Sequence, residues 1–108
     1  MNRYNFLMIC NPVAGREVDF NEWYTNQHLP DVLRVPGFIG AQRFQVAGET
    51  TLPGQYITIF EIETDDPAAT LGQLQHLAGT PEMPISDALD VTSVSGTLLA
   101  PITARLTQ

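Results

Sequence analysis

The chain has 108 residues, a typical length for one domain, and 44% of them are hydrophobic, enough to build a packed core. Twelve acidic residues against five basic ones give a formal net charge of −7. This negative charge argues against nucleic acid and anionic membrane surfaces as partners, because both attract positive charge. We expect a single domain over residues 1–108.

The cysteine and histidine content restricts the chemistry further. Cys10 is the only cysteine, so no intramolecular disulfide can form, and we expect a reducing, cytoplasmic location. The apolar run that ends at Cys10 is too short for a signal peptide or a membrane span. We interpret Cys10 as a buried strand residue. His28 and His76 lie far apart in the sequence without neighbouring cysteines, so we predict no metal site.

The first half of the chain predicts a strand, a helix and a second short helical turn. Residues 3–11 carry apolar side chains on both faces of a strand, which is typical of a central strand. Asp19 and Glu22 have the spacing of a capping box and predict a helix start at Asp19. Pro30 disfavours a helical conformation at Leu29, so we expect a kink there and a short turn that begins at the proline.

The second half predicts three strands and one helix. Residues 38–47 and 55–63 form two strands, and Asp66 followed by a proline starts a helix that runs to about Ala78. Residues 91–100 form the last strand. The order β-α-β-β-α-β with right-handed crossovers predicts a ferredoxin-like α+β fold, an antiparallel four-stranded sheet with both helices on one face.

The face of this sheet without helices is a predicted partner site. Phe44, Tyr56, Phe60 and Leu99 alternate with other apolar residues along the expected strands, so both faces carry hydrophobic side chains. An uncovered apolar face of this kind marks an interaction site. We expect a homodimer in which two sheets pack face to face and close a barrel between the subunits.

One stretch resembles a known family. An aromatic pair at Trp23 and Tyr24 precedes His28 and Pro30, and a Pro-Gly-Phe turn follows at residues 36–38. This pattern resembles the EthD-like branch of the dimeric α+β barrel superfamily, which implies the same fold and a dimeric barrel. The superfamily includes cofactor-free monooxygenases, polyketide cyclases, lactone isomerases, dehalogenating and haem-dependent enzymes, and proteins of no known activity. The resemblance therefore does not select a reaction.

The first predicted helix has a face that is apolar at one end and polar at the other. Its members recur at helical spacing: Phe20, Trp23, Tyr24, Gln27, His28 and Asp31. Buried polar groups need partners. The polar end therefore predicts a cleft that holds water or a ligand.

His28 is the best catalytic candidate, since its ordinary pKa of about 6.5 allows proton transfer near neutral pH. Asp31 is expected to orient the imidazole, and the Tyr24 hydroxyl to donate to a substrate oxygen or to His28. A structural interpretation stays open for each: the His28–Asp31 pair ends the helix, and Tyr24 packs in the core. The resemblance, in which the matching histidine faces the cleft, favours the catalytic role of His28.

Five further residues are candidates for substrate binding. Trp23 and Phe20 form either core packing or a pocket wall. Asn5, Tyr56 and Arg43 are strand residues that we expect at the same cleft, with a surface or interface charge as the alternative for Arg43.

No flavin, nicotinamide or metal motif is present, so we expect no cofactor. The leading hypothesis is a small cofactor-independent lyase, cyclase or isomerase that acts on an apolar, aromatic or carbonyl-bearing metabolite. The alternatives are a cofactor-free monooxygenase of the same fold, a non-catalytic ligand-binding or accessory dimer, and a haem site with His28 as axial ligand.

Overall fold

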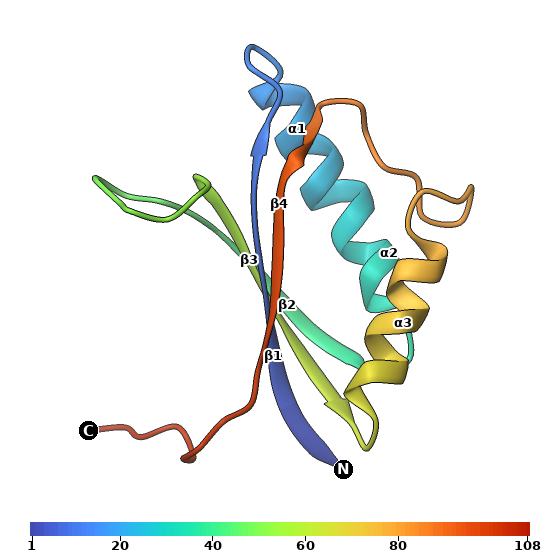
Figure 1. Ribbon diagram of the computed structural model, residues 1–108, viewed down its shortest axis with the longest axis vertical. Helices are drawn as coiled ribbons and strands as arrows, with labels where there is room; N and C mark the ends of the chain where they lie inside the picture. Colours follow the sequence, from blue (N-terminus) through green and yellow to red (C-terminus); the bar gives the residue numbers. More distant parts are fainter.

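A computed structural model describes residues 1–108 and places four strands in one sheet. The strands are β1 (Asn2–Pro12), β2 (Phe38–Gln45), β3 (Tyr56–Thr64) and β4 (Leu89–Leu99). They lie in the order β2-β3-β1-β4, and every neighbouring pair is antiparallel. All helices lie on one face of the sheet, and the other face is uncovered (Figure 1). The predicted ferredoxin-like α+β fold is confirmed.

The first helix runs without a break through Pro30 by widening into a π-helical turn. Its parts are α1 (Glu17–Trp23), η1 (Tyr24–His28) and α2 (Leu29–Leu33). The Leu29 N–H donates to the Tyr24 carbonyl, five residues earlier, and Leu29 is helical with φ −58° and ψ −50°. The expectation of a non-helical Leu29 was wrong. In an α-helix the ring of Pro30 would collide with a carbonyl of the preceding turn, and the wider π turn relieves that collision.

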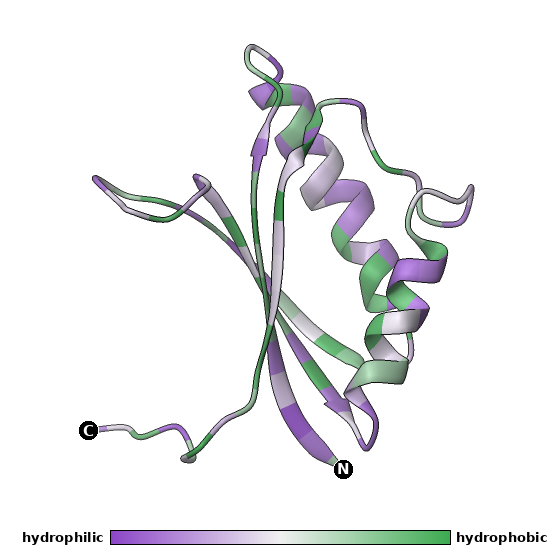
Figure 2. Ribbon diagram, in the orientation of Figure 1, coloured by the Kyte–Doolittle hydropathy of each residue, from purple (hydrophilic) through white to green (hydrophobic).

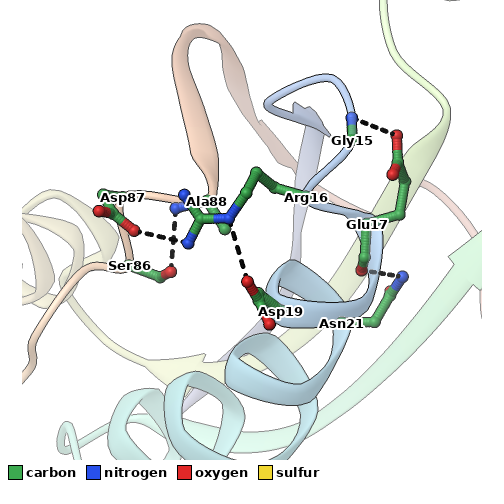
Figure 3. Close-up of polar contacts among 8 residues, drawn as sticks. All are labelled: Gly15, Arg16, Glu17, Asp19, Asn21, Ser86, Asp87 and Ala88. Atoms are coloured by element: carbon green, nitrogen blue, oxygen red, sulfur yellow. Dashed lines mark hydrogen bonds and ion pairs between the residues drawn. The ribbon is translucent and has the colours of Figure 1, made fainter.

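The start of this helix also differs from the prediction. The helix begins at Glu17 after Arg16, with no side-chain cap, so the expected start at Asp19 was wrong. Instead of capping, Asp19 accepts a hydrogen bond from Arg16 Nε at 3.0 Å, and Arg16 Nη2 donates to Asp87 at 2.9 Å (Figure 3). Arg16 therefore connects the beginning of α1 to the loop that precedes β4.

The second helix, α3 (Pro67–Leu77), begins where the sequence predicts. Asp66 Oδ1 accepts the Ala69 N–H at 3.1 Å, so its side chain caps the helix. After the helix Gly79 takes a positive φ of 86°, a conformation that costs other residues energy. None of the helices has the length and hydrophobicity that a membrane crossing requires.

The core between sheet and helices is divided into two clusters of buried side chains. One contains Val32, Val35, Phe38, Phe60, Ile62 and Met83. The other contains Cys10, Phe20, Tyr24 and Ala88. Leu29 packs against both. The hydrophobic stretch of β1, which follows its hydrophilic N-terminal end in Figure 2, passes beneath both clusters.

The strand register assigns side chains to the two faces of the sheet. Tyr56 and Phe60 share the helix-covered face, whereas Phe44 and Leu99 lie on the uncovered face and are 41% and 42% exposed. Leu7, Ile57 and Ile59 lie beside them on the uncovered face. The prediction that both faces are apolar is confirmed.

Removing the cap of α3 should destabilise the protein. We expect Asp66→Ala to lower the free energy of unfolding by about 1 kcal/mol, because the first turn loses its only side-chain acceptor. Urea denaturation measures the change. Asp65→Ala is the matched control, since its exposed carboxylate caps no helix. Equal losses in the two variants would contradict the capping role.

Candidate functional site

A cavity of about 600 Å³ lies between the helices and the sheet. Apolar side chains of β1 and β4 line the sheet side, and Leu71 and Leu74 of α3 line one wall. Trp23, Tyr24 and His28 contribute a further wall. No side chain of Arg, Lys, Asp or Glu lines the cavity, so it suits a neutral, largely apolar molecule.

His28 is the polar residue of this cavity with the most unusual surroundings. Its ring stacks on Trp23 with centroids 4.7 Å apart and meets Tyr24 edge-on at 4.9 Å. Its Nδ1 is buried and has no hydrogen-bond partner. Burial lowers the pKa of His28 to about 4, while the charge of Asp31 opposes the shift and that of Arg43 adds to it. The imidazole is therefore neutral at pH 7.

The other ring nitrogen, Nε2, is the one that a ligand can reach. Among side-chain nitrogens and oxygens, Nδ1 alone is both fully buried and unpaired. Nε2 also makes no hydrogen bond, so it cannot be fully buried. A neutral imidazole accepts a hydrogen bond at one nitrogen and donates at the other. Through Nε2, His28 can thus act on a bound molecule as acceptor or donor, according to its tautomer.

Tyr24 lies between this imidazole and the interior. It is 3% exposed, and burial raises its pKa to about 12, although the neighbouring Thr58 hydroxyl and the charge of Arg43 act in the opposite direction. The phenol therefore stays protonated at every ordinary pH. Tyr24 can serve the cavity as a hydrogen-bond donor.

Trp23 forms the outer wall beside His28. Its indole Nε1 donates to the Pro84 carbonyl oxygen at 3.1 Å, which fixes the ring to the loop before β4. The indole lines the cavity and covers one face of the imidazole. Of the residues predicted to bind substrate, Trp23 is the one that the structure places at the cavity.

Asp31 makes no hydrogen bond to His28. It is 4% exposed, and its Oδ2 accepts from Gln27 Nε2 at 2.9 Å while its Oδ1 accepts from the Arg34 guanidinium. It lines a separate cavity of about 390 Å³. The expected orienting hydrogen bond to the imidazole is absent, because Gln27 and Arg34 satisfy the carboxylate instead.

The remaining four candidates also lie away from the cavity. Phe20 is fully buried, and its ring meets that of Tyr56 at 5.1 Å with Arg43 above both. These three side chains pack behind Tyr24 and line none of the cavity. Asn5 lies on the uncovered face of the sheet, paired with Glu61 and Leu99. The structure therefore does not bring these four residues to the cavity that His28 lines.

Two of the lining residues that the sequence did not identify are informative. Gly96 of β4 lies so close to β1 that an added Cβ would meet Phe6 Cζ at 2.8 Å and Met8 Sδ at 3.0 Å. A glycine inside a strand signals such a close approach and could have identified it.

Cys10 is buried as predicted, and burial raises its pKa to about 11, so the thiol is unreactive. The reducing compartment stays a prediction.

No group of three or more His, Cys, Asp and Glu side chains is placed to hold a metal ion. The site consists of one neutral imidazole, one protonated phenol and a largely apolar lining that includes the polar Gln75.

The sheet order and the helices on one face are those of a ferredoxin-like α+β fold (Figure 1). No family model and no curated protein matches the chain in sequence. Similar solved structures include an EthD family protein of Bacillus halodurans, with 16% identity over 93% of this chain and 99% of that one, at a TM-score of 0.58.

Two other similar structures carry functional descriptions. The heme-degrader MhuD of Mycobacterium tuberculosis, with two hemes in its active site, has 17% identity over 94% of this chain and 98% of that one, at a TM-score of 0.63. The cofactor-independent oxygenase SnoaB of Streptomyces nogalater has 18% identity over 99% and 97%, at a TM-score of 0.58. At these identities the similarity establishes the fold alone.

The buried imidazole should make the protein less stable in acid. Below pH 6.5 the unfolded chain takes up a proton at His28 that the folded protein, with a pKa of about 4, does not. Between pH 7 and 4 this removes about 3 kcal/mol of stability, at 1.36 kcal/mol per pKa unit.

We expect His28→Phe to flatten the pH dependence of the unfolding free energy by that amount, measured by urea denaturation across this pH range. His76→Phe is the control, because His76 is exposed. Parallel pH profiles for wild type and His28→Phe would contradict the burial of a neutral imidazole.

Proposed function

We propose that this protein is a small cofactor-independent enzyme acting on a neutral, apolar compound, aromatic or carbonyl-bearing, with His28 as general acid and base. The observation that carries the proposal is an unpaired imidazole at the wall of an uncharged cavity of about 600 Å³. A buried polar atom without a partner is uncommon and needs an explanation. A ligand at Nε2 would not pair with Nδ1, but because no protein group fixes the tautomer of the ring, Nε2 is free to donate to a ligand or accept from it.

The chemistry that suits this arrangement moves a proton within one substrate. A neutral His28 takes a proton at Nε2 from one substrate atom and returns it at another, and Tyr24 donates a hydrogen bond to the substrate oxygen. Hydrogen bonds in an apolar enclosure are stronger than in water. Lyase, cyclase and isomerase reactions are of this type and need no external oxidant or reductant.

A cofactor-independent oxygenase is the second candidate. The cavity is lined mainly by apolar side chains, which suits both molecular oxygen and an electron-rich aromatic substrate. SnoaB, which shares the fold, is described as such an oxygenase. Oxygen uptake with a phenol or quinol substrate supports this candidate, and turnover without oxygen consumption supports proton transfer.

A haem fits the site less well. Nε2 of His28 is available as an axial ligand, and MhuD binds two hemes in its active site. The propionates of a haem need cationic partners, however, and no arginine lines this cavity. We therefore derive no reaction step from a haem.

Replacing the imidazole should abolish turnover while leaving binding largely intact. We expect His28→Gln, which keeps a hydrogen-bonding side chain without acid–base capacity, to lower kcat by about 10²–10⁴-fold with little change in ligand affinity. The assay uses a panel of neutral phenols, quinols and cyclic ketones, with affinity measured by quenching of Trp23 fluorescence.

His76→Gln is the matched control, since this histidine is exposed on α3 and should leave turnover unchanged. Full activity in His28→Gln would contradict the acid–base role. Ligand binding by the wild type without any turnover would instead support a non-catalytic binding or accessory dimer.

We also propose that the uncovered face of the sheet pairs with a second copy of the chain. Phe44 and Leu99 are more than 40% exposed there and adjoin Leu7, Ile57 and Ile59. Apolar side chains exposed in this way are unfavourable in water. Packing two of these faces together removes them from solvent on both copies.

The dimer should be sensitive to one charge on this face. We expect wild type to sediment as a dimer at micromolar concentration and Phe44→Glu to sediment as a monomer, because the carboxylate would be buried unpaired at the interface. Val18→Glu is the control, at a position that is 72% exposed on α1. A wild-type monomer would overturn the proposed pairing.

A further inference from the structure

Arg43 of β2 makes three hydrogen bonds to the helix that carries the site. Its Nη2 donates to Asn21 Oδ1 at 2.9 Å, and its Nη1 donates to Thr25 Oγ1 at 2.9 Å. Nη1 also donates to the backbone carbonyl of Asn21 at 3.5 Å. Asn21 belongs to α1 and Thr25 to η1, so the guanidinium spans the point where the α-helix widens into the π turn.

The charge of Arg43 has no carboxylate partner. Arg3, Arg16 and Arg34 each form ion pairs, and Arg43 forms none. Its guanidinium carbon instead lies over aromatic rings, 4.5 Å from the Tyr24 centroid and 5.4 Å from that of Phe20. Placing a half-buried cation there costs desolvation energy, which cation–π contacts and hydrogen bonds offset. Its position is thus specified by the helix and not by an acidic residue.

The beginning of the π turn is a weak point in the backbone ladder. The Tyr24 N–H is shared between the carbonyls of Phe20 and Asn21, which shows that the regular pattern changes here. A π turn persists where surrounding contacts hold it in place. Arg43 supplies such contacts on both sides of Tyr24 in the sequence, to Asn21 before it and to Thr25 after it.

We propose that Arg43 is a positioning residue that holds the π turn and, through Tyr24, sets the place of His28 in the cavity wall. The Tyr24 ring lies between the guanidinium, at 4.5 Å, and the imidazole, at 4.9 Å. Arg43 itself does not line the cavity. This role of Arg43 rests on the proposed function, because His28 is the residue that it positions. The contacts themselves can be tested without measuring turnover.

The charges around His28 are few, so a change at Arg43 should be visible in its titration. Asp31 of α2 raises the pKa of the imidazole and Arg43 lowers it. Cys10 of β1 and Tyr24 are protonated and neutral, and α3 and β4 bring no charged side chain to the cavity.

Arg43→Lys and Thr25→Val test the proposal in the full-length protein. The lysine keeps the positive charge but cannot reach Asn21 and Thr25 together. The valine removes one acceptor at an exposed position, where little packing depends on the side chain. The first readout is hydrogen exchange of the Leu29 amide, which makes the π-turn bond to Tyr24, relative to amides of β3. The second is the NMR titration of His28.

In Arg43→Lys we expect Leu29 exchange to accelerate about tenfold or more and the His28 and Tyr24 ring signals to shift, because a bidentate contact to the turn is lost. Thr25→Val should change both readouts in the same direction by less. Arg3→Lys, on an exposed part of β1, is the control and should change neither.

Wild-type exchange and His28 signals in both test variants would overturn the proposal, and so would full rescue by the lysine, since charge alone would then suffice. If Arg43→Lys does not fold, Thr25→Val decides the outcome by the same two measurements. Neither readout involves catalysis. A wild type without enzymatic activity would contradict the proposed function, but hydrogen exchange and NMR would still decide whether Arg43 holds the π turn.

Discussion

The ring of Pro30 is the constraint around which the first helix is built. A regular α-helix through this position would drive the proline ring into the preceding turn. The chain instead inserts one residue and forms the π turn Tyr24–His28. Residues on both sides of the turn remain fully packed, with Phe20 in one cluster and Val32 in the other. The wider turn carries Tyr24 and His28 at the wall of the cavity.

The divided core follows from this geometry. The first helix contributes side chains to two separate clusters. The cavity adjoins both, because Tyr24 belongs to one cluster, Phe6 packs against the other, and both line the cavity. An unfilled space in so small a domain forfeits dispersion contacts that close packing would supply. Proteins retain such a loss where a ligand occupies the space, which agrees with a cavity whose wall holds an unsatisfied imidazole.

Much of the fold was predictable from local patterns, and most of the site was not. Apolar periodicity located all four strands to within two residues, and Asp66 marked its helix because a cap is a local interaction. Pro30 was misjudged because sequence rules treat it as a helix breaker, and a π turn has no comparable signature. The partners of Asp31 were equally undetermined, since helical spacing brings both Gln27 and Arg34 within its reach.

Strand residues were harder to assign, because one step in register reverses the face of a side chain. In β2 the pairing register with β3 shifts between Phe38 and Gly40, which makes such a step before Arg43 in the strand.

The alternation of β1 has a consequence for how this protein can change over generations. Phe6, Met8 and Cys10 line the cavity, while Leu7, between them, lies on the uncovered face. Two different surfaces therefore share one backbone. An insertion or deletion of a single residue in this strand would exchange them, so the cavity and the outer face can diversify only by substitution, and each side chain of β1 must be compatible with the side on which it already lies.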